Sequence, residues 1–159
     1  MSERDRIVDL LRRVHDGDAW HGPSVMSALE GVDAVLARAR PIASAHTIWE
    51  TALHIVAWRH EVEQRLADRT PALPAEGDWP PVPEDDAEWG EVAGMLQASH
   101  ESAVAAILAI GDAELERVVG DEREPGLGSG VTVAVMLHGL VHHDAYHAGQ
   151  ISLLKKSRP

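Results

Sequence analysis

The 159-residue chain has no cysteine, and this absence excludes disulfide bonds, thiolate metal ligands and a cysteine nucleophile. Phenylalanine is also missing and tyrosine occurs once, so most of the aromatic bulk must come from tryptophan. We expect the tryptophans to pack in the core and beneath a lid rather than to form a stacking platform. They are Trp20, Trp49, Trp58, Trp79 and Trp89.

Basic residues are also scarce: 14 lysines and arginines stand against 26 acidic residues, which gives a formal net charge of −12. Nucleic acids and anionic membrane surfaces attract proteins mainly through basic groups, so neither is an expected partner. No apolar run approaches the roughly 20 residues that a membrane span needs. The charged N-terminus, MSERDRIVDLLRR, lacks the apolar centre of a signal peptide, and we therefore expect a cytoplasmic protein.

Apolar residues recur at helical spacing in four segments, over about 3–15, 45–67, 86–110 and 131–156. A shorter helix can begin at Pro23 and Ser24, because proline is favoured in the first turn of a helix. No segment alternates with the period of a strand, so no sheet is predicted. These features predict an all-α four-helix bundle that forms one domain over residues 1–159.

Two loops interrupt the helical pattern. Residues 70–86 (TPALPAEGDWPPVPEDD) contain five prolines and are expected to form an ordered loop or lid. Residues 120–130 contain the run GLGSG, which lacks the Lys-Ser/Thr ending of a phosphate-binding loop and follows no predicted strand. We therefore expect this second loop only as a flexible lead-in to the last helix.

Histidine is abundant, with ten residues, and four of them lie in the last predicted helix. His138 and His142 form one pair at i, i+4 spacing, and His143 and His147 form another. Such spacing places two imidazoles about 6 Å apart on one helix face, where they can share a metal ion. A projection at about 100° per residue groups the second pair with apolar residues and the first pair with small or polar ones. Because a ligand pair in a bundle points inward, the projection favours His143 and His147.

A third ligand must come from another helix, and residues 45–67 offer His54 and His60. His54 is preferred over His60 as the third ligand, because it lies on the edge of the apolar face beside Trp58. The pattern alone leaves both candidates open. Single histidines are usually ordinary core or surface residues, and a pair at this spacing also arises by chance. A metalloprotease is not expected, because Asp144 replaces the glutamate of the HExxH motif.

Several runs of the sequence together resemble one known family. The run HDAYHAGQI, residues 143–151, is similar to the HxxxHxGQ signature of the DinB-like superfamily. The runs AWHGPS, HTIWETALHIVAWR and DWPPVP resemble that family's first linker, second helix and Trp-Pro loop, so the resemblance covers nearly the whole chain. It implies a four-helix bundle with three metal-binding histidines, which map onto His54, His143 and His147.

Three neutral imidazoles would leave at least one position open on a divalent ion such as Zn²⁺ or Ni²⁺, where water or a thiol can bind. The resemblance and this donor set together predict a metal-dependent enzyme, either a thiol S-transferase or a hydrolase. Its expected partners are a small-molecule substrate, for the transferase a low-molecular-weight thiol, and a second copy of the chain in a homodimer. The alternative is a non-catalytic metal-binding or stress-associated bundle, because a fold alone does not decide function.

Three polar residues are candidates for supporting roles in such a site. Glu50 and Asp144 are the candidates for a general base. Gln150 lies one turn beyond His147 and can orient a ligand imidazole, although packing or capping is an equally good explanation for it.

Overall fold

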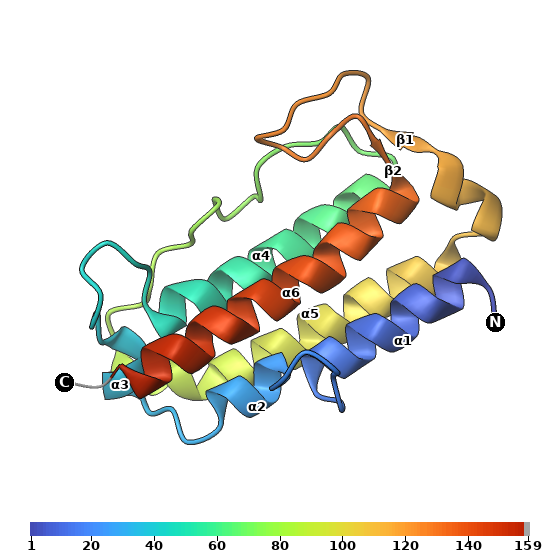
Figure 1. Ribbon diagram of the computed structural model, residues 1–159. Helices are drawn as coiled ribbons and strands as arrows, with labels where there is room; N and C mark the ends of the chain where they lie inside the picture. Colours follow the sequence, from blue (N-terminus) through green and yellow to red (C-terminus); the bar gives the residue numbers. More distant parts are fainter. Residues whose placement is uncertain (158–159) are drawn as a thin grey trace.

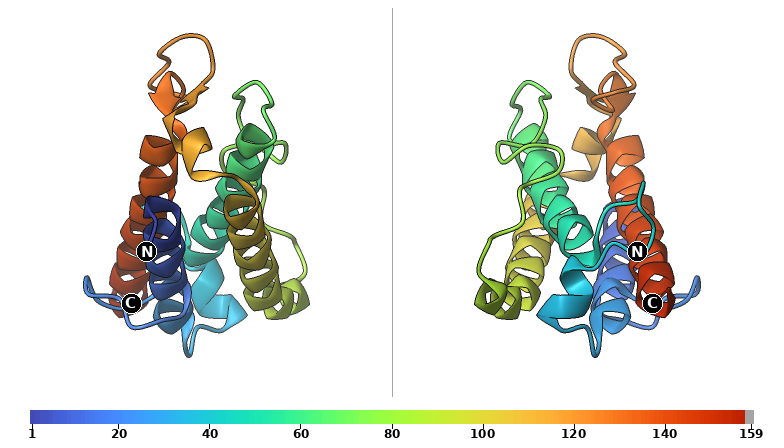
Figure 2. Two further views of the ribbon diagram at one scale, coloured as in Figure 1. Left: turned by 90° about the vertical axis from the view of Figure 1, so that its right-hand side faces the viewer. Right: turned by 90° about the vertical axis from the view of Figure 1, so that its left-hand side faces the viewer.

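Four long helices pack side by side in the structure, a computed structural model that describes residues 1–157 (Figure 1). They are α1 (Glu3–His15), α4 (Ile48–Leu66), α5 (Trp89–Ala109) and α6 (Val133–Lys156). Both α1 and α4 contact α5 and α6, so each long helix lies between two others (Figure 2). The predicted all-α helical bundle is confirmed.

Side-chain caps fix where the helices begin. Ser2 accepts a hydrogen bond from the Asp5 N–H at the start of α1, and the Asp5 carboxylate accepts one from the Ser2 N–H. Thr47 and Glu50 form the same reciprocal pair at the start of α4. This cap explains why α4 begins at Ile48 and not at residue 45 as predicted.

Helices α4 and α5 are neighbours and run parallel, because the long connection between them returns the chain to the end where α4 begins. Two short helices, α2 (Val25–Leu29) and α3 (Ala34–Arg38), lie at the end of the bundle where both α4 and α5 begin (Figure 1). Residues 67–85 therefore return along α4 before a short helix, η1 (Asp86–Glu88), leads into α5. This return path carries the proline-rich segment past the middle of α4.

A two-stranded ribbon joins α5 to α6. After η2 (Asp112–Glu116), β1 (Val118–Val119) pairs antiparallel with β2 (Val131–Thr132). The expectation that the chain forms no sheet is wrong here, because two-residue strands are too short to show an alternating pattern. The ribbon also explains why α6 begins slightly later than predicted.

Buried apolar side chains form two core clusters, one on the side of η2 and the ribbon and the other on the side of α2 and α3. Trp49 is fully buried in the second cluster, and Trp89 packs edge-on against it with ring centroids 5.2 Å apart. Trp20 is completely exposed in the linker after α1, so the expectation that all the tryptophans pack inside is wrong for this residue. Among the helices within residues 1–157, none has both the length and the apolarity to cross a membrane.

Candidate metal centre

Three imidazoles from two facing helices meet in the groove between α4 and α6. The Nε2 atom of His143 lies 2.9 Å from Nε2 of His54 and 3.2 Å from Nε2 of His147. His54 and His147 are buried, and His143 is partly buried. One ring nitrogen from each residue lies within 4.8 Å of the others, a spacing at which all three can contact a single ion.

The structure separates this trio from the other candidate histidines. His60 and His142 are exposed, and Nε2 of His138 lies 2.8 Å from a carboxylate oxygen of Glu3 on α1. The structure thus brings together the three histidines expected from the resemblance, and none of the three alternatives. That the trio binds a metal ion stays a prediction.

Hydrogen bonds on the far side of two of the rings, those of His54 and His147, turn their lone pairs toward His143. His54 donates from Nδ1 to the Asp78 carbonyl at 2.5 Å, so Nε2 of this neutral ring carries no proton. His147 donates from Nδ1 to Gln150 Oε1 at 2.6 Å, with the same result. A single proton on His143 can satisfy only one of these two lone pairs, whereas a cation satisfies both. The residues therefore fit a divalent metal ion.

Burial keeps two of these rings neutral. Desolvation, together with the neighbouring imidazoles, lowers the pKa of His147 to about 3. Desolvation lowers the pKa of His54 as well. Metal ligation requires neutral imidazole, so both rings are in the ligating form at neutral pH.

The proline-rich segment covers the trio as a lid. The Trp79 indole stacks on His54 with ring centroids 3.9 Å apart, and His46 stacks on the other face of the indole at 3.4 Å. Trp58 of α4 donates a 2.8 Å hydrogen bond to Asp78 Oδ1 and so holds the segment in place. Neither Asp78 nor His46 is predicted from the sequence as a site residue. Trp79, a tryptophan within a polar, proline-rich run, is a signal that points to its neighbour Asp78, whereas no pattern marks His46.

A comparison with protein families bears on this site. The model of the DinB superfamily matches residues 19–151. The chain belongs to the DinB superfamily. Searches of curated proteins and of solved structures gave no match. The matched range includes all three histidines of the trio in this DinB-superfamily protein.

Behind His143, the DinB bundle buries an ion pair. Arg59 of α4 donates to Asp144 Oδ2 from Nη2 at 2.7 Å and from Nε at 3.1 Å, and both side chains are 0% exposed. Burial by itself raises the pKa of Asp144, but the Arg59 guanidinium and the His143 ring together outweigh burial and hold this pKa below its usual value. Asp144 Oδ1 lies 3.6 Å from His143 Nδ1, too far for a hydrogen bond, so the carboxylate supports the ring from behind only through its negative charge.

Neither candidate for a general base is free in this DinB-superfamily structure. Asp144 is engaged by Arg59. Glu50 accepts hydrogen bonds from the Thr47 N–H at 2.6 Å and from the Arg40 guanidinium at 2.8 Å. Both carboxylates therefore hold parts of the protein together, and no base is assigned.

The ion pair continues into a buried polar cluster next to α1 and α5. Arg59 Nη2 donates to His15 Nδ1 at 3.3 Å, and His15 stacks on His100 with ring centroids 4.0 Å apart. Desolvation lowers the pKa of His15 and lowers the pKa of His100 to about 3. The folded protein thus keeps two core imidazoles neutral over a pH range in which free histidine becomes charged.

We expect the metal-free protein to lose stability as the pH falls below about 6.5, the ordinary pKa of histidine. In that range the unfolded chain binds more protons at His15 and His100 than the folded chain does, so acid favours unfolding. Urea denaturation at about pH 7 and about pH 5 measures the slope of the free energy of unfolding against pH. His100→Gln should reduce it by up to about 1.4 kcal/mol per pH unit. His142→Gln, at an exposed position, is the control, and an equal slope in both variants contradicts the prediction.

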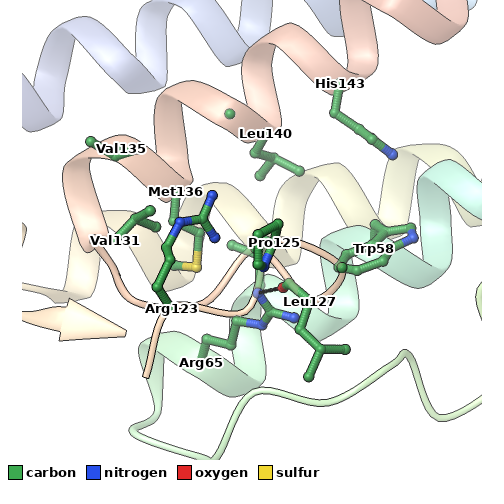
Figure 3. Close-up of a pocket in the computed structure, with 14 residues that line it drawn as sticks. Trp58, Arg65, Arg123, Pro125, Leu127, Val131, Val135, Met136, Leu140 and His143 are labelled. Carbon is green, nitrogen blue, oxygen red and sulfur yellow. Dashed lines mark hydrogen bonds between the residues drawn. The ribbon is translucent and has the colours of Figure 1, made fainter. Parts of the chain in front are cut away.

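Two cavities flank the trio along the groove between α4 and α6. One has a volume of 370 Å³, reaches His143 and Trp58, and is largely apolar (Figure 3). The other has a volume of 430 Å³, reaches His147, and is more polar. Its polar side chains are those of Ser44, His46, Thr51, Tyr146 and Gln150. Both volumes fall in the range of small-molecule sites, roughly 300–1,000 Å³, so a ligand can lie against the trio from either side.

Proposed function

We propose that this protein is a metal-dependent thiol S-transferase that joins a low-molecular-weight thiol to a small electrophile. The observation that carries the proposal is the position of three close imidazoles between two separate cavities. A transferase must hold two small molecules beside one activating group, and two cavities that border the same trio suit that need. A hydrolase needs room for only one organic substrate and water.

Zinc or nickel is the metal that we propose for the trio, because neutral imidazole suits both ions. When bound, such an ion lowers the pKa of a thiol that ligates it and so supplies a thiolate at neutral pH. His54, His143 and His147 would hold the ion and would leave room on it for the sulfur. We propose the cytoplasm as the place of action, because small thiols are kept reduced there.

The protein's own residues orient and enclose the reactants. The Asp78 carbonyl and Gln150 fix two of the rings, and Trp79 covers one face of His54. The more polar cavity beside His147 suits the polar body of a thiol compound. In the transfer, the thiol releases its proton and its sulfur bonds to the electrophilic carbon. The leaving group departs with the electron pair of the bond that breaks.

Turnover by the metal-loaded protein tests this proposal. We expect protein loaded with zinc or nickel to accelerate the reaction of chlorodinitrobenzene with at least one thiol from a panel of cysteine, glutathione and mercaptoethanol. A chelator should abolish the acceleration, because the thiolate is then no longer supplied at neutral pH. Absorbance of the thioether product measures the rate.

Two histidine variants make the test specific for the trio. His143→Ala should abolish turnover, whereas His142→Ala, at an exposed neighbouring position, should preserve it. Chelator-sensitive hydrolysis of an ester without any thiol would replace the transferase with a hydrolase. The absence of any chelator-sensitive reaction across the panel would favour the non-catalytic metal-binding bundle.

A further inference from the structure

We infer that the apolar cavity beside His143 binds the apolar body of a small anionic compound, and that Arg123 holds the anion. Figure 3 shows His143 and Arg123 on opposite sides of this cavity. A ligand that spans it therefore has one end at the histidine trio and the other at a guanidinium. The inference rests on the proposed function only in taking this compound to be the electrophile; the binding site itself rests on the cavity.

Residues of α4, α6 and the loop between β1 and β2 line the cavity, which is open to solvent on one side (Figure 3). Its aliphatic walls are formed by Val62, Leu127, Val131, Val135, Met136 and Leu140. Val135 is 57% exposed despite its apolar side chain, so an apolar ligand would remove this surface from water. The volume of 370 Å³ suits a ligand about the size of a substituted aromatic ring system.

The loop between β1 and β2 is held over the cavity as a roof. Arg65 of α4 donates a 2.7 Å hydrogen bond to the Leu127 carbonyl. Gly130 has a φ of +70°, and a Cβ there would lie 2.5 Å from the Arg123 Cα, so only glycine lets the loop close this tightly. The loop expected only as a flexible lead-in to the last helix therefore also forms one wall of a binding cavity.

The Arg123 guanidinium has N–H groups that can donate to a ligand. It donates from Nη1 to the Ser129 carbonyl at 2.9 Å and forms no ion pair with any carboxylate of residues 1–157. Arg65, the other arginine at the cavity, is already neutralised by Glu61 at 2.8 Å. A guanidinium presents paired N–H groups that match carboxylate and sulfonate oxygens. An anionic group on the ligand is therefore expected at Arg123.

Gly139 on α6 lines the cavity and offers a way to fill it. A Cβ at Gly139 would meet no atom within 4 Å, so a larger side chain extends into empty space. Gly149, further along α6, also has no atom within 4 Å of a Cβ but does not line the cavity. Leucine raises helix propensity at both positions. The two leucine variants therefore differ mainly in whether the cavity is filled.

Two fluorescent probes test the site in metal-free protein without any thiol. Anilinonaphthalene sulfonate combines an apolar body with an anion, and phenylnaphthylamine is its neutral counterpart. Both should bind the wild type and Gly149→Leu, and Gly139→Leu should weaken both by at least about tenfold because it fills the apolar space. Arg123→Gln should weaken only the sulfonate, by about tenfold, because it removes a charge-assisted hydrogen bond.

The outcomes separate this inference from the proposed function. Equal probe binding by Gly139→Leu and Gly149→Leu would show that the cavity is not the site. An equal effect of Arg123→Gln on both probes would overturn the assignment of the anion. Intact probe binding in a protein that catalyses no thiol transfer would refute the proposed function and leave the inference standing. Circular dichroism of each variant establishes that the helices are retained.

Discussion

The His143→Ala variant is expected to purify with little bound metal. The substitution removes the ring whose Nε2 atom lies 2.9 Å from that of His54 and 3.2 Å from that of His147. Loss of a residue that only supports a ligand typically costs about 10–100-fold in metal affinity, so loss of a ligand should cost more than about 100-fold. His54→Ala and His147→Ala should behave in the same way. Elemental analysis of the purified protein and the rise in melting temperature on adding metal measure the effect.

Three further alanine variants show whether this effect belongs to the trio. His138→Ala and His142→Ala lie on the same helix as His143, so general damage to α6 would affect all three alike. His60→Ala is the matched control for His54 on α4. We expect all three controls to keep near-normal metal content. If His142→Ala loses its metal while His143→Ala retains it, the assigned face of α6 is wrong.

The Arg59→Met variant is expected to lower the free energy of unfolding by about 3–5 kcal/mol, the usual cost of breaking a buried ion pair from one side. Methionine fills part of the same volume but leaves the Asp144 carboxylate at 0% exposure without its cation. Because Asp144 supports His143, the variant should also bind metal more weakly. Urea denaturation at about pH 7, with and without metal, measures both effects.

A double variant and a surface pair complete this test. Arg59→Met combined with Asp144→Leu should recover much of the lost stability, because no unpaired charge remains buried. Arg13→Met breaks the exposed pair with Asp9, whose side chains are 52% and 49% exposed, and should cost about 0.5 kcal/mol or less. A loss for Arg59→Met no larger than that for Arg13→Met would contradict the prediction.

The long helices could be predicted because apolar residues recur with the helical period along one face of each helix. Ile48, Ile55 and Val62 on α4 follow this period, and all three are buried. The same face contains a signal that the sequence analysis misses, because Arg59 occupies the turn between Ile55 and Val62. A charge at such a position needs a buried partner. Its partner, Asp144, lies 85 positions away, so only the tertiary structure identifies it.

The histidine trio could be predicted only in part from local pattern. His143 and His147 share a helix, so a single projection relates them, whereas the choice of His54 needs the family resemblance. The carbonyl that orients His54 could not be predicted, because every residue has a carbonyl and nothing in its side chain marks Asp78. Its position depends on the path of the lid, which in turn depends on α4 and α5 running parallel.

The spacing of the three histidines along the chain bears on the thermodynamic linkage between metal binding and folding. His143 and His147 lie one turn apart, so a chain that is helical only there already presents two imidazoles. His54 lies 89 positions before His143 and joins them only when α4 docks against α6. We therefore expect the unfolded chain to retain a weak affinity for the metal, so that at saturation the ion would stabilise the native state according to the ratio of the two affinities. Stabilisation by added metal consequently reaches a plateau once the free ion concentration exceeds the dissociation constant of the unfolded chain.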